Sequence, residues 1–120
     1  MTTVDMPFHP QMADAVLEGR KCCTTRSTKK GSIGDLFMVR EYLYRIVEIR
    51  LHPLDFIARN YYSMEGCDGP QEFRDLWMDL HKGAYDPKDL KYVHFFAAVR
   101  LHDARSCACI TCTCDIGVKA

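Results

Sequence analysis

The stretch "EGRKCCTTRSTKKGSIGD", residues 18–35, decides how the rest of the chain is interpreted. Its segment "KCCTTR" is rich in β-branched residues and too short for a helix, which predicts a strand over 21–26. Side chains alternate along a strand, so two sets should face opposite ways. The sets are Lys21, Cys23 and Thr25 on one side, and Cys22, Thr24 and Arg26 on the other. A bend where a preceding helix meets the strand could still bring Lys21 and Thr24 to one cavity.

Outward from this stretch, helical and extended patterns follow one another along the chain. Pro10 suits the first turn of a helix, and Gly19 suits its end. Phe73, Trp77 and their neighbours follow the helical 3, 4, 7 spacing, so we expect them in the core. The predicted elements are a helix from Pro10, strands over 21–26, 35–40 and 41–51, helices over 54–62 and 70–83, and a strand over 92–99.

The run "EYLYRIVEIRL", residues 41–51, alternates as a half-buried strand does. Its aliphatic side is Leu43, Val47, Ile49 and Leu51, and its other side is Tyr42, Tyr44, Glu48 and Arg50. The last strand is apolar on both faces, so we expect it to be central in the sheet. Sequential strands can pair through short loops, and the last strand returns to join them.

This order of elements predicts an α+β domain with a small, mostly antiparallel curled sheet or barrel and flanking helices. The domain should cover residues 1–103. Composition changes sharply after it, so residues 104–120 are expected to be a cysteine-rich extension.

Bulk composition excludes some classes of protein. The 120 residues carry 16 basic and 16 acidic side chains, so steering toward nucleic acid must come from local clusters. No apolar run is long enough to cross a bilayer, and the N-terminus lacks the pattern of a signal peptide. An odd count of seven cysteines without a signal favours reduced thiols, hence a cytoplasmic protein without membrane contact.

The opening stretch resembles the ASCH domain, a family related to PUA-like barrels. The hallmark of that family is a Gly-x-Lys-x-x-[Glu/Thr]-x-Arg run at the first strand, followed by Gly-Asp. The similarity covers roughly residues 8–100 and includes "LYRIVEI", "EFRDLWMDLH" and "YVHFFAAV". The matching residues here are Gly19, Lys21, Thr24 and Arg26, then Gly34 and Asp35.

The resemblance implies a barrel with a cleft suited to a nucleobase or an RNA segment. It is closest in motif to a small branch of amidohydrolases that act on N4-acetylcytidine and carry Thr at the Glu/Thr position. That branch implies a catalytic set of Lys21, Thr24 and Glu65, without a cofactor or a metal. A lysine that gives up its proton can act as general base to a threonine hydroxyl, and the cations of Arg20 or Arg26 would disfavour a charged lysine.

Two alternatives remain open on the residues alone. Lys21 and Glu65 could form a plain ion pair. The cleft could also bind RNA without chemistry, with phosphates contacted by a cationic strip and bases stacked on aromatic side chains. The strip consists of Arg20, Arg26, Lys29 and Lys30, and binding through it should weaken with salt.

The last cysteines form a C-x-C-x2-C-x-C pattern. Four thiolates so close together could wrap a soft metal such as zinc or copper(I). The competing interpretation is an extension of no fixed role. The cysteines are Cys107, Cys109, Cys112 and Cys114.

Overall fold

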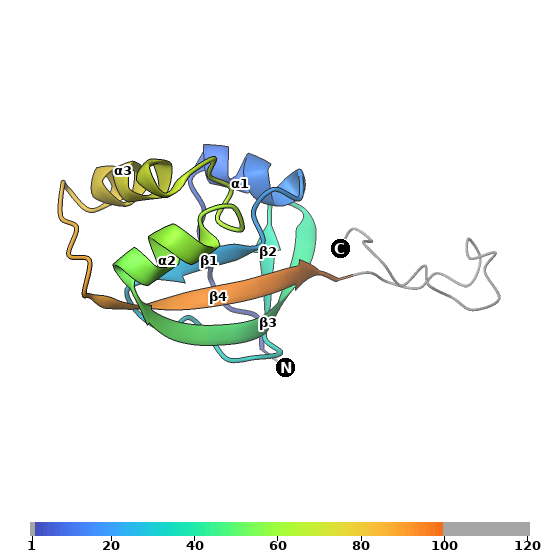
Figure 1. Ribbon diagram of the computed structural model, residues 1–120. Coiled ribbons are helices and arrows are strands. Elements are labelled where there is room, and N and C mark those ends of the chain that lie inside the picture. Colours follow the sequence, from blue (N-terminus) through green and yellow to red (C-terminus); the bar gives the residue numbers. More distant parts are fainter. Residues whose placement is uncertain (1, 100–120) are drawn as a thin grey trace, which may run out of the picture.

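Four antiparallel strands form one curled sheet in the computed structural model, which describes residues 2–99 (Figure 1). The strands are β1 (Cys23–Arg26), β2 (Leu36–Val39), β3 (Tyr42–Pro53) and β4 (Leu90–Ala98), in the spatial order β1-β4-β3-β2. The central place of β4 is as predicted. β1 and β2 do not pair with each other, because β4 and β3 lie between them.

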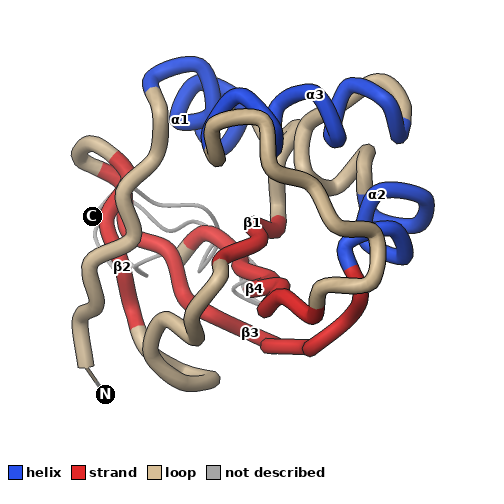
Figure 2. The backbone as a smooth tube through the Cα atoms, turned by 90° about the vertical axis from the view of Figure 1, so that its left-hand side faces the viewer, coloured by secondary structure: helices blue, strands red, loops and turns tan. Residues whose placement is uncertain are grey.

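Within residues 2–99 three helices accompany the sheet, in the chain order that the sequence predicts. They are α1 (Pro10–Leu17), α2 (Leu54–Tyr61) and α3 (Pro70–Leu80). Pro10 and Pro70 both stand in first turns, where a missing N–H costs nothing. Figure 2 shows the strands curling below α1 and α3, with α2 following the end of β3. None of the helices in residues 2–99 has both the length and the apolar character to cross a membrane.

The predicted facing of β3 is wrong. Val47 and Leu51, assigned to the aliphatic side, are each 48% exposed, whereas Tyr44 and Ile46 are buried. The register with β4 shifts between Ile46 and Glu48, which is a β-bulge. A bulge adds one residue to one strand, so Ile49 lies on the face of Tyr44 and Ile46 and packs against their cluster, not on the face of Leu43 as predicted. A strict period of two cannot anticipate that change of face.

Two clusters of buried side chains form the core of the described part of the chain. The first packs α1 against β2, β3 and β4, and the second packs α2 and α3 against β1 and β4. Phe73 and Trp77 belong to the second cluster, as the helical spacing predicts. The expected domain boundary at residues 103 and 104 and the four-cysteine pattern lie outside the described residues.

Candidate functional site

Lys21 and Glu65 are brought together by backbone contacts before their side chains meet. The Lys21 N–H donates to the Ala15 carbonyl at 3.1 Å, where α1 ends, and Lys21 and Glu65 form an isolated antiparallel bridge. Gly66 follows with φ +88°, and a Cβ there would lie 3.3 Å from the Lys21 Cβ. A glycine is therefore required for this close approach.

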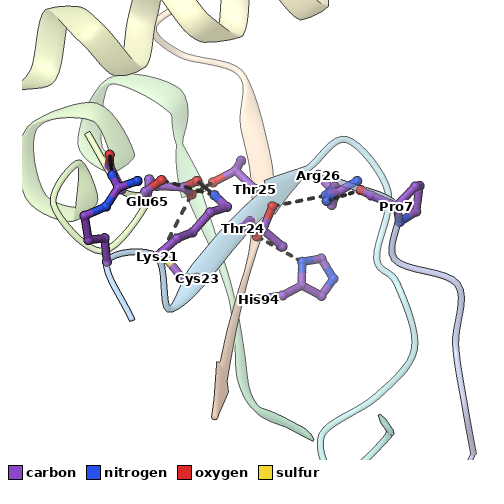
Figure 3. Close-up of polar contacts among 10 residues, drawn as sticks. Pro7, Lys21, Cys23, Thr24, Thr25, Arg26, Glu65 and His94 are labelled. Carbon is purple, nitrogen blue, oxygen red and sulfur yellow. Dashed lines mark hydrogen bonds and ion pairs between the residues drawn. The ribbon is translucent and has the colours of Figure 1, made fainter. Parts of the chain in front are cut away.

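The Glu65 carboxylate is the centre of a buried polar cluster (Figure 3). Its Oε1 lies 2.7 Å from Lys21 Nζ, and the side chains of this ion pair are only 3% and 4% exposed. Its Oε2 accepts a hydrogen bond of 2.5 Å from Thr25 Oγ1 and lies 3.7 Å from Cys23 Sγ. Lys21, Cys23 and Thr25 are the set that strand alternation predicts on one side.

Thr24 and Arg26 make their contacts on the other side of β1. Arg26 Nε donates to Thr24 Oγ1 at 3.2 Å, and its terminal amine donates to the Pro7 carbonyl at 2.7 Å. The guanidinium also lies 5.0 Å from the centre of the Phe8 ring. Burial lowers the pKa of Arg26, although it stays a cation at any pH of interest.

His94 fixes the backbone behind Thr24. Its Nε2 accepts the Lys30 backbone N–H at 2.9 Å, so the ring hydrogen is on Nδ1, which donates to the Thr24 carbonyl at 3.3 Å. The ring is completely buried, and burial lowers the pKa of His94. The residue is therefore neutral at neutral pH.

A pocket of about 280 Å³ lies beside Glu65 and the threonines of β1. Residues from β1, from the segment just before it and from the Glu65 loop make one part of its lining: Lys21, Thr24, Thr25, Arg26 and Glu65. Side chains of α1, of the segment before it, of α3 and of the residue after α3 make the apolar and aromatic part: Phe8, Met12, Phe73, Leu76, Trp77, Leu80 and His81. His81 stacks on Trp77 with the ring centres 3.9 Å apart.

The structure therefore places Lys21, Thr24 and Glu65 in the lining of one pocket, and their catalytic role stays a prediction. It does not bring the four cations of the predicted strip to that pocket. Arg26 lines it, Arg20 pairs with Glu18 at the surface, and Lys29 borders a separate hollow. The side chain of Lys30 lies in neither lining.

Sequence reasoning left Thr25 out of the site. The alternation along residues 21–26 already placed Thr25 on the side of Lys21, so the signal was present. The assignment of Thr24 came from the family motif, which outweighed that signal.

The described cysteines are poorly suited to act as nucleophiles. Burial raises the pKa of Cys23 strongly and that of Cys67 to about 11, so both are thiols at neutral pH. Burial also raises the pKa of Cys22. Within residues 2–99 no three His, Cys, Asp or Glu side chains lie so that they could hold a metal ion.

Comparison with known proteins identifies the fold. No protein-family model matches the chain, and no curated protein matches it in sequence. Among solved structures, an ASCH domain from Lactobacillus crispatus JV V101 matches with a TM-score of 0.59 at 12% identity, over 81% of this chain and 79% of that one. A DUF984 protein from Enterococcus faecalis V583 matches with a TM-score of 0.55 at 14% identity, over 74% of this chain and 67% of that one. These likenesses, together with the helices and curled antiparallel sheet, show that the chain has the α+β fold of an ASCH domain.

Proposed function

We propose that this chain binds a modified nucleoside, free or as part of an RNA, in the pocket beside β1 and hydrolyses an N-acyl group on its base, as in N4-acetylcytidine. The observation that carries the proposal is the buried Lys21–Glu65 pair in the lining of that pocket, next to threonine hydroxyls. Removing two charges from water is costly, so a buried pair that borders a cavity is a candidate for chemistry as well as for structure.

The pocket has the size and lining for one nucleoside. Its volume of about 280 Å³ lies just below the range of roughly 300–1,000 Å³ that small-molecule sites occupy. Phe8, Trp77 and His81 in its lining offer aromatic surface, on which proteins commonly stack an unpaired base. The polar groups of β1 would then lie beside the functional groups at the edge of the base.

The residues supply the groups that amide hydrolysis needs. A threonine hydroxyl attacks the acyl carbon, a carboxylate takes its proton, and an ammonium stabilises the negative charge that develops. Glu65, and not the lysine expected from the sequence, can take the proton, because Lys21 Nζ lies 2.7 Å from Glu65 as its ion-pair partner and can supply the positive charge. The family resemblance assigns the hydroxyl to Thr24.

RNA binding without hydrolysis is the competing function, and Arg26 in the pocket lining is its best support. The other members of the cationic strip lie away from the pocket, which weakens the version that needs all four at one cleft.

The test is incubation of the purified chain with N4-acetylcytidine, with cytidine and acetate followed by chromatography. We expect turnover by the unmodified chain and a loss on the order of 100-fold or more in Glu65→Gln, the usual scale for removing a general base. Glu18→Gln, which breaks the surface ion pair with Arg20, should stay within about threefold, because surface pairs contribute little. No release of cytidine by the unmodified chain would contradict hydrolysis. Salt-sensitive binding of short RNAs would then favour the competing function.

A further inference from the structure

We infer that the hydroxyl that attacks the acyl carbon is that of Thr25, not that of Thr24, with Glu65 as its base. This inference rests on the proposed function and deepens it, because it names the nucleophile of the same site. It replaces the assignment that the family motif suggests.

Thr25 has the contact that a nucleophile makes with its base. Its Oγ1 donates to Glu65 Oε2 at 2.5 Å, at the short end of the range for a hydroxyl that donates to a carboxylate. The other carboxylate oxygen is held at 2.7 Å by Lys21 Nζ, which fixes the orientation of Glu65. The nucleophile thus contacts its base, and the base contacts a third group that orients it, which is the chain of contacts found in hydrolytic triads.

Thr24 has the opposite kind of partner. Its Oγ1 accepts a hydrogen bond of 3.2 Å from Arg26 Nε, so the hydroxyl oxygen donates electron density to a cation. That contact weakens a nucleophile, whereas a carboxylate that accepts the hydroxyl proton strengthens one. Thr24 still lines the pocket and is free to donate its hydroxyl proton to a bound base.

The two hydroxyls cannot exchange places without disrupting the sheet. Thr24 is paired with His94 and Thr25 with Val93 in the register between β1 and β4. The Nδ1 hydrogen of His94 is bonded to the Thr24 carbonyl, which holds this register from inside the core. A slip by one residue would turn every side chain of β1 to the other face.

The reaction balances with these groups alone and one water molecule. Thr25 Oγ1 bonds to the acyl carbon as its proton passes to Glu65. The C–N bond then breaks, and Glu65 returns the proton to the leaving exocyclic nitrogen, which leaves cytidine and an acyl ester on Thr25. Water attacks the ester, Glu65 accepts a proton from it and passes that proton to Thr25 Oγ1, and the carboxylic acid is released.

The experiment compares two isosteric substitutions at adjacent positions, Thr25→Val and Thr24→Val, with Thr25→Ser as the rescue. The measurement is kcat/KM for N4-acetylcytidine, with thermal unfolding of each variant as the control for folding. We expect a loss on the order of 1,000-fold in Thr25→Val, recovery to within about tenfold in Thr25→Ser, and a loss under about tenfold in Thr24→Val, because removing a nucleophile costs far more than removing one binding contact.

Several outcomes would overturn the inference. Turnover by Thr25→Val within about tenfold of the unmodified chain would do so, and so would a loss in Thr24→Val equal to that in Thr25→Val. An acetylated protein detected by mass spectrometry with Thr25→Val would do so as well, whereas the same adduct with Thr24→Val would support the inference. A chain that is inactive before any substitution contradicts the proposed function itself, so that failure is distinguishable from the failure of Thr25 alone.

Discussion

Two neighbouring residues, Arg20 and Lys21, each form an ion pair with a glutamate at 2.7 Å. The two pairs differ in burial and in how far apart the partners lie along the chain. The side chains of Arg20 and Glu18 are 56% and 58% exposed, whereas those of Lys21 and Glu65 are 3% and 4% exposed. Glu18 lies two residues from its partner, and Glu65 is presented by a loop beyond β3 and α2. The distance between charges is therefore the same, and the surroundings are not.

The difference teaches that contact distance does not determine what an ion pair contributes. In water the attraction of the exposed pair is screened, and its two long side chains lose freedom when they meet. In the core the attraction is strong, but both charges have lost their hydration. Removing one partner therefore leaves the other as a buried charge without compensation. Replacing Glu65 would in addition deprive Thr25 Oγ1 and Cys23 Sγ of the carboxylate oxygen that they contact.

Breaking the buried pair should give the largest effect on stability. We expect Lys21→Met and Glu65→Gln each to lower the free energy of unfolding by about 3–5 kcal/mol, because each leaves an uncompensated buried charge. The double variant leaves no such charge and should recover more than half of the summed loss. Urea unfolding of all four proteins measures this coupling. If the two losses simply added in the double variant, the two charges would not be interacting.

The contrast between partners that are near and far in the sequence also explains how much of the site could be predicted. The order of all seven elements and the central place of β4 follow from local patterns, and the approach of Glu65 to Lys21 is implied by the family resemblance. The hydrogen-bond partner of each threonine could not be predicted in this way. It depends on which side of β1 the Glu65 loop covers, and that loop is distant from β1 in the sequence. The face of β3 was missed for a similar reason, since the bulge at Val47 is fixed by pairing with β4.

His94 offers an intermediate effect, which depends on pH. Burial lowers its pKa below the ordinary value of 6.5, the hydrogen bond to the Thr24 backbone opposes this shift, and the charge of Arg26 adds to it. The unfolded chain therefore binds a proton at His94 more readily than the folded chain does. Stability from this residue is complete above about pH 6.5 and is lost as the pH falls toward the lowered pKa.

We expect the urea midpoint of the unmodified chain to fall as pH drops below 6.5, and His94→Gln to show a flatter dependence, though from a lower starting stability. Protonation would also disrupt the hydrogen bond from the Lys30 N–H, because Nε2 could no longer accept it. His9→Gln is the matched control, since His9 is exposed. An unchanged slope in His94→Gln would show that other groups carry the pH dependence.

The smallest effect is expected from the exposed pair, and it completes the comparison. Glu18→Gln should lower the free energy of unfolding by no more than about 1 kcal/mol, because solvated pairs gain little over their separate hydration. The change should shrink further when salt is raised, since exposed charges are screened over about 10 Å at 0.1 M ionic strength. Glu65→Gln should keep its larger effect at the same salt concentrations, because solvent ions do not reach its carboxylate. Urea midpoints of the two variants at low and high salt measure both the loss of stability and its dependence on salt. Equal salt sensitivity in the two would mean that water reaches the Lys21–Glu65 pair and that the pocket above it is filled with solvent down to the charges.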